Sequence, residues 1–261
     1  MINALMRRVR YARSRAAERS RRRALSRIGE DEASISLDMD SDSRTLLLAF
    51  GGMEGRIGMP PFEFLRLTGD IPVKRLFVRD LRQAWYHRGM PGHGSTLGEV
   101  TESLRAMIAE HDVERMVFTG NSAGGYAALV FGTLLGADVV LAFAPQTNLD
   151  PAVLSRWGDH RWDERLLPLV KEGALDERWV DLGSALPGAR VADTRYQVYF
   201  DDSLAVDRQH AESLLGLPGL RLYRFGRGAH HLVRSLRDDG ALARIVRGAL
   251  ELPLDGDGAP S

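Results

Sequence analysis

Residues 115–129 read RMVFTGNSAGGYAAL, and this stretch decides the fold. It starts with a short apolar run typical of a buried strand. It ends in residues 123–135, which are rich in alanine and leucine and typical of a helix. Between the two lies the pattern G-x-S-x-G, centred on Ser122. This pattern is typical of a sharp turn from strand to helix, which side chains at Gly120 and Gly124 would obstruct.

Ser122 in such a turn is a candidate nucleophile. The turn projects the hydroxyl from the carboxyl edge of a sheet, and the next helix directs its N–H groups and positive dipole end there. The N–H of Ala123 is therefore a candidate oxyanion donor. The ordinary alternative is a glycine-rich turn in which Ser122 is the N-cap of a helix. The pattern alone is weak, and its strand and helix context gives it weight.

Outward from this turn, short apolar runs alternate with stretches of helical length. The expected strands are residues 45–50, 74–78, 115–119, 138–143, 196–200 and 220–225, and the expected helices are residues 98–110, 123–135, 208–215 and 232–251. Continuous apolar strands are covered on both faces, as in a parallel sheet. The chain therefore predicts an α/β fold with a doubly wound, mostly parallel sheet and helices on both faces.

The chain is expected to have three parts. Residues 1–43 form a basic arm followed by an acidic stretch, and SISLDM at 34–39 alternates like an antiparallel edge strand. Residues 44–251 form the α/β domain, and residues 252–261 form a disordered tail. Within the domain, residues 146–194 show no clear strand and are long for a connection, so they predict a small lid or cap over the ligand crevice.

Composition excludes several kinds of chemistry. The chain has no cysteine, which excludes disulfides, thiolate nucleophiles and cysteine-ligated metals. No metal-ligand cluster, phosphate-binding loop or dinucleotide fingerprint is present, so we expect no metal and no cofactor. Apolar runs are too short for a transmembrane segment, and the N-terminus lacks the apolar stretch of a secretory signal. A cytoplasmic protein is expected.

Charge is balanced overall, with 35 basic and 35 acidic residues, but it is unevenly distributed. Residues 7–27 hold ten arginines and a single acid, Glu18. The favoured interpretation is a solvated helix that pairs with neighbouring acids. The alternatives are weak docking to an anionic partner, nucleic acid or lipid, and a transit-type peptide.

A serine nucleophile needs a base, and the base needs an orienting acid. Residues 226–231 read GRGAHH and follow the last expected strand, where the base of a Ser-His-Asp triad is expected. His230 is preferred over His231. For the acid, Asp202 has the usual short offset from its strand, whereas Asp207 could instead be the N-cap of the next helix. Spacing alone does not separate these two aspartates.

A second oxyanion donor is expected in the loop after an early strand. Gly51 and Gly52 follow the strand at 45–50, and glycines there let backbone N–H groups approach a substrate.

A polar and aromatic cluster after the next strand is left unassigned, because aromatic residues are more often core: Arg79, Trp85, Tyr86 and His87.

Three stretches resemble a group of bacterial α/β-hydrolase proteins. They are GNSAGGYAALVFGTLLGADVVLAFAPQT at 120–147, YFDDSLAVDRQHAESL at 199–214 and GAHHLVRSL at 228–236. The group carries a G-N/S-S-x-G-G elbow, a later F-x-P-Q-T stretch, a D-x-x-H-A segment and a final H-x-x-V-x-x-L. The elbow is shared across the superfamily, whereas the second and third patterns are narrower. The resemblance covers roughly residues 45–250.

This resemblance implies an α/β-hydrolase fold with Ser122 as nucleophile and His230 as base. It favours Asp207 slightly over Asp202, because Asp207 occupies the first position of D-x-x-H-A. We therefore expect a serine hydrolase of the esterase or thioesterase class, which acts on a small molecule through an acyl-enzyme. The alternatives are an acyltransferase with the same triad, and a non-catalytic binding module that uses the basic arm for docking.

Overall fold

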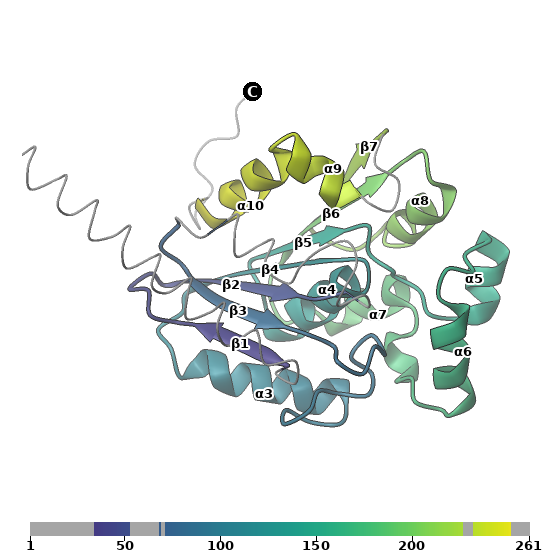
Figure 1. Cartoon of the computed structure of the whole chain (residues 1–261), viewed down its shortest axis with the longest axis horizontal. Coiled ribbons are helices and arrows are strands. Elements are labelled where there is room, and N and C mark those ends of the chain that lie inside the picture. The colour runs from purple at the N-terminus through teal and green to yellow at the C-terminus, as the bar shows by residue number, and fades with distance from the viewer. Residues whose placement is uncertain (1–33, 53–67, 69–70, 227–231, 252–261) are drawn as a thin grey trace, which may run out of the picture.

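A seven-stranded sheet forms the centre of the computed structural model (Figure 1). The structure describes residues 34–52, 68, 71–226 and 232–251. The strands are β1 (Ile35–Asp38), β2 (Thr45–Phe50), β3 (Lys74–Val78), β4 (Arg115–Asn121), β5 (Val139–Phe143), β6 (Arg195–Asp201) and β7 (Leu220–Phe225). Their order is β1-β3-β2-β4-β5-β6-β7. β1 pairs antiparallel with β3, and β2 to β7 pair parallel.

The apolar runs form these strands because both faces of the sheet are covered. Successive side chains of a strand point to opposite faces. In β2, Leu46, Leu48 and Phe50 enter one core, whereas Leu47 and Ala49 enter the other. This distribution explains why the strand sequence is apolar at consecutive positions.

Helices cover both faces, as expected for a doubly wound sheet. They are α3 (Leu97–Ala109), α4 (Ala123–Leu135), α5 (Pro151–Trp157), α6 (Asp163–Lys171), α7 (Leu182–Ala189), α8 (Ala205–Glu212), α9 (Leu232–Asp238) and α10 (Ala241–Glu251). Buried residues of α3, α4, α7 and α8 belong to one core, and those of α9 and α10 belong to the other. Figure 1 shows α9 and α10 above the sheet and α3 below it.

All six expected core strands are present, and β1 confirms the expected edge strand. The helices expected at 98–110 and 123–135 are confirmed, whereas that expected at 208–215 begins earlier, at Ala205. The single helix expected at 232–251 is wrong. Two helices occupy it, because Gly240 has a positive φ of 74° and the Asp239 carboxylate accepts a hydrogen bond from the N–H that starts α10.

The predicted lid region, residues 146–194, is a helical insertion between β5 and β6. It contains α5, α6, a short 3-10 helix (Glu177–Trp179) and α7. Figure 1 shows α5 and α6 beyond the carboxyl ends of the strands, the edge at which α/β proteins bind ligands. The insertion is therefore at the position that a lid requires, and its action as a lid stays a prediction.

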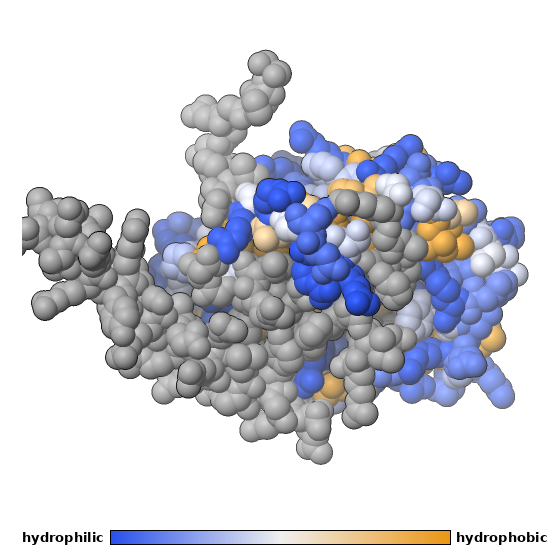
Figure 2. Space-filling view, turned by 45° about the horizontal axis from the view of Figure 1, so that its top comes forward, coloured by the Kyte–Doolittle hydropathy of each residue, from blue (hydrophilic) through white to orange (hydrophobic). Residues whose placement is uncertain are grey.

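Several sequence predictions fall on other parts of the chain. The arginine-rich arm, the tail at 252–261, and the loop that holds His230 and His231 lie outside the described residues. In the described part, the surface seen in Figure 2 is largely hydrophilic, with apolar residues in small patches. No described helix is long and apolar enough to cross a membrane.

Helix α4 packs against the sheet without room for side chains at several positions. A Cβ on Gly124 would lie 2.3 Å from the carbonyl oxygen of Phe50. A Cβ on Gly132 would lie 2.4 Å from the Val140 side chain. The small residues of the sequence pattern therefore allow the first turn of α4, which follows β4, to pack against the end of β2.

We predict that Gly124→Ala destabilises the fold by about 1–3 kcal/mol, because overpacking forces the backbone apart. The matched control is Gly248→Ala on α10, where a Cβ would meet nothing within 4 Å. That change should stabilise by about 1 kcal/mol, because alanine is the better helix former. Urea unfolding measures both, and equal stabilities of Gly124→Ala and wild type would contradict the close approach of α4 and β2.

Candidate active site

Ser122 lies in a strained turn between β4 and α4. Its φ is 57° and its ψ is −118°, a region that non-glycine residues rarely adopt. The Ser122 N–H donates to the carbonyl of Phe143 at 2.9 Å, so the end of β5 holds the turn. A Cβ on Gly120 would lie 2.1 Å from the carbonyl oxygen of Gly124. This strained turn from strand to helix has the backbone geometry that a nucleophile elbow requires.

The alternative of an ordinary N-cap does not describe Ser122. The residue occupies the N-cap position of α4, but its side chain makes no capping hydrogen bond. An N-cap usually has backbone angles in the β region, whereas Ser122 has a positive φ. The strain at Ser122 is therefore not explained by capping of the helix.

Two backbone N–H groups near Ser122 are the candidate oxyanion donors. The N–H of Ala123, at the start of α4, has no acceptor among the described residues, and neither has that of Gly52. A Cβ on Gly52 would lie 3.2 Å from the carbonyl oxygen of Asn121, so this loop passes close to the elbow. Gly51 differs, because its N–H donates to the carbonyl of Val78 at 2.8 Å. Of the two candidate glycines, Gly52 is therefore the one whose N–H could donate to a substrate oxygen.

The two candidate acids have different environments. Asp207 lies in the first turn of α8 and is buried, with 2% of its surface exposed. It is not the N-cap, because the helix starts at Ala205, so that alternative is wrong. Asp202 has a side chain 39% exposed and lies 4.0 Å from Arg208. Water screens a charge at Asp202 more strongly than one at Asp207, which favours Asp207 as the acid.

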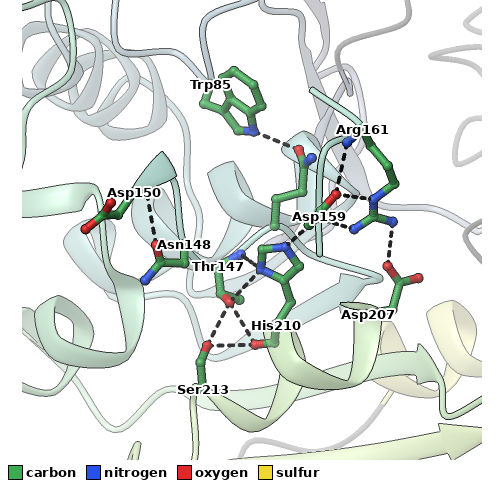
Figure 3. A network of polar contacts seen from close by, with 10 residues as sticks. Trp85, Thr147, Asn148, Asp150, Asp159, Arg161, Asp207, His210 and Ser213 are labelled. Carbon is green, nitrogen blue, oxygen red and sulfur yellow. Dashed lines mark hydrogen bonds and ion pairs between the residues drawn. The ribbon is translucent and has the colours of Figure 1, made fainter. Parts of the chain in front are cut away.

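A buried polar network surrounds Asp207 (Figure 3). Arg161 donates to Asp207 at 2.7 Å, and through Nε and Nη2 to Asp159 at 2.7 and 2.6 Å. Asp159 also contacts Nε2 of His210 at 3.0 Å. The backbone N–H of Thr147 lies 3.0 Å from Nδ1 of His210. Because Nδ1 must accept from this N–H, Nε2 carries the proton and donates to Asp159.

The network joins two stretches that carried the family resemblance. Thr147 ends the P-Q-T stretch after β5, and His210 belongs to D-x-x-H-A on α8. The Thr147 hydroxyl lies 2.7 Å from the His210 carbonyl oxygen and 2.8 Å from the Ser213 hydroxyl. Gln146, the neighbour of Thr147, is bonded through its N–H to the carbonyl of Ser122 at 3.4 Å. These contacts place the last turn of α8 against the segment that follows β5, and this segment is bonded to Ser122.

Burial and charge set the protonation states in this network. Burial lowers the pKa of His210, although Asp159 opposes the shift, so the ring is neutral. Burial alone would raise the pKa of Asp159, but hydrogen bonds from Arg161 and His210 lower it below its usual range. The cluster thus holds a guanidinium, a neutral imidazole and an ionised Asp159 beside Asp207.

Sequence reasoning missed three members of this network. Asp159 and Arg161 lie in the insertion, where no pattern marked them. His210 was visible in D-x-x-H-A, but only as part of a resemblance. No group of three or more histidines and acids within the described part of the chain is arranged to hold a metal ion.

The aromatic cluster after β3 belongs to the core. Asp80 accepts hydrogen bonds from backbone N–H groups within residues 82–86, at 2.7–3.0 Å. Trp85 and Tyr86 have positive φ and are fully buried. Trp85 donates to the side chain of Gln146 at 2.7 Å. The loop therefore supports the segment beside the elbow.

His87 fastens the insertion to the domain. Its Nε2 lies 2.7 Å from the Tyr126 hydroxyl on α4, and its Nδ1 accepts from the N–H of Asp176 at 2.9 Å. The Tyr126 hydroxyl donates to the carbonyl of Trp179 at 2.9 Å. Burial lowers the pKa of His87 to about 4.

Comparisons with known proteins agree in fold. No family model and no curated protein matches the chain. The solved capsule O-acetyltransferase of Neisseria meningitidis serogroup A is similar over 81% of this chain and 91% of its own, with TM-score 0.59 and 11% identity. A substrate-bound, fluorophosphonate-binding serine hydrolase of Staphylococcus aureus is similar over 83% and 92%, with TM-score 0.56 and 14% identity. An α/β hydrolase from a lagoon-sediment metagenome is similar over 83% of this chain and 95% of its own, with TM-score 0.54 and 16% identity.

We predict that His87 makes the fold less stable in acid. The unfolded chain binds a proton at His87 below pH 6.5, whereas the folded chain does so only below about pH 4. Unfolding therefore takes up a proton between these values, and stability falls as pH falls, by roughly 3 kcal/mol in total.

Urea unfolding between pH 7 and pH 4 measures this effect. His87→Gln cannot titrate, so its stability should fall by roughly 3 kcal/mol less than that of wild type over this range. Tyr126→Phe keeps the imidazole and is the control: it should lose stability at pH 7 but retain the wild-type pH dependence. Parallel curves for wild type and His87→Gln would contradict the prediction.

Proposed function

We propose that this chain, which has the α/β-hydrolase fold, is a serine hydrolase that cleaves an ester or thioester of a small molecule. The observation that carries the proposal is the strained Ser122, with two N–H groups nearby in the chain fold, those of Gly52 and Ala123, that have no acceptor in the described residues. A non-glycine residue rarely adopts this conformation, and the conformation is the one that a nucleophilic serine takes at a strand-to-helix turn. His230, with His231 as the alternative, is the base by its place in the sequence.

The proposed reaction passes through an acyl-enzyme. His230 takes the proton of the Ser122 hydroxyl while Oγ attacks the acyl carbonyl carbon. The N–H groups of Gly52 and Ala123 donate to the oxyanion, and the carboxylate of Asp207 stabilises the imidazolium. The bond from the acyl carbon to the leaving oxygen or sulfur then breaks, the imidazolium protonates that atom, and the alcohol or thiol departs. Water repeats the sequence on the acyl-enzyme and releases the acid.

Acyl transfer is the second candidate. The same acyl-enzyme would react with an acceptor alcohol in place of water, which changes the product but none of the groups around Ser122. The similarity in fold to a capsule O-acetyltransferase favours keeping this candidate. Product analysis of an ester substrate, with and without added alcohols, separates the two reactions.

We predict that a fluorophosphonate probe adds once to the wild-type protein and not to Ser122→Ala. Phosphonylation requires an activated serine, so His230→Ala should react at least about 100-fold more slowly. Intact mass follows the adduct, and circular dichroism verifies that each variant is folded. A folded wild type that does not react would contradict the proposal and favour a non-catalytic binding module.

We predict that the same substitution, aspartate to asparagine, has different effects on kcat at Asp207 and at Asp202. Asp207→Asn should lower kcat by about 100-fold or more, because it removes the charge that stabilises the imidazolium. Asp202→Asn is the matched control and should change kcat less than about threefold, because its side chain is 39% exposed and water screens its charge. Turnover of a chromogenic ester measures both variants. The reverse order of the two effects would assign the acid to Asp202.

A further inference from the structure

The helical insertion contributes a cation to the proposed triad acid. Arg161 lies between α5 and α6, and it donates to Asp207, 46 residues later in the chain, at 2.7 Å. The Asp207 side chain is 1% exposed and that of Arg161 is 25% exposed. An ion pair in this setting is weakly screened, unlike those on the surface.

Arg161 is itself held in place. Its Nε and Nη2 donate to the two oxygens of Asp159, at 2.7 and 2.6 Å, and its backbone N–H donates to the same carboxylate at 3.2 Å. His210 in turn fixes Asp159. Such a fork has a defined geometry that a flexible ammonium would lack. The guanidinium therefore presents Nη1 to Asp207 from a fixed direction.

The pairing of Arg161 with Asp159 does not by itself explain why Arg161 also contacts Asp207. Both oxygens of Asp159 already receive hydrogen bonds from Arg161, so the pair of these two residues is complete. The contact from Nη1 of Arg161 fixes a different carboxylate, that of Asp207. Figure 3 shows one oxygen of Asp207 toward Arg161 and the other directed away from it. An acid that orients a histidine needs such a fixed rotation.

We propose that Arg161 is a positioning residue that acts through Asp207: it holds one carboxylate oxygen so that the other meets the catalytic base. This inference rests on the proposed function. The insertion then contributes a residue to the active site. Arg161 reaches the reaction only through Asp207, so its loss should affect kcat more than KM.

The test uses the full chain with an ester substrate. Arg161→Met should lower kcat by about 10–100-fold and leave KM within about threefold. Arg161→Lys should recover only part of the loss, because an ammonium cannot bridge both carboxylates. Arg156→Met is the matched control, because Arg156 is an exposed arginine at the end of α5, and it should behave as wild type.

Arg161→Met leaves the buried carboxylates of Asp159 and Asp207 without their cation, so loss of activity could reflect loss of folding. Arg161→Met combined with Asp159→Asn removes both charges and keeps an acceptor oxygen for His210. The double variant should regain most of the melting temperature that Arg161→Met loses and remain about 10–100-fold low in kcat.

A double variant with wild-type kcat would overturn the inference and leave Arg161 a structural role. A rise in KM with unchanged kcat would also overturn it, because it would place Arg161 against the substrate. Serine labelling of the wild type keeps the two proposals apart. Labelled wild type with fully active Arg161→Met refutes only the role of Arg161, whereas unlabelled, inactive wild type refutes the proposed function and with it this inference.

Discussion

The positive φ of Ser122 is the constraint on which the rest of the structure depends. The turn exists because Gly120 and Gly124 approach each other more closely than side chains allow, and because β5 accepts the N–H of Ser122. The same closeness brings the end of β2 against the first turn of α4. It thereby brings the loop of Gly52 close to the turn that holds Ser122 and Ala123.

A second constraint is the burial of charge at the start of α8. Asp207 and Asp159 share one guanidinium, and His210 stays neutral between Asp159 and the backbone of Thr147. The residues of this network come from the end of β5, from the insertion and from α8. Buried networks are stable only when their members are all satisfied, so these three segments must keep a fixed relation to one another. The insertion is further tied to α4 through His87.

The sequence predicts most of the fold, because β2 and its neighbours are apolar at consecutive positions and the elbow has a fixed glycine spacing. It missed the start of α8, since Leu204 at the N-cap position makes no side-chain capping bond. It could not separate Gly51 from Gly52, because the end of the sheet decides which N–H is bonded. Nor could it find Arg161, whose contact with Asp207 depends on the tertiary fold alone.

The central claim is that Ser122 is a nucleophile whose oxyanion is held by Gly52 and Ala123. The most direct measurement is a crystal structure of the wild-type protein after reaction with a small fluorophosphonate. The account predicts continuous density from Ser122 Oγ to phosphorus, with the phosphonyl oxygen within hydrogen-bond distance of the N–H groups of Gly52 and Ala123. Phosphorus on another residue, or a phosphonyl oxygen that contacts neither N–H, would contradict it.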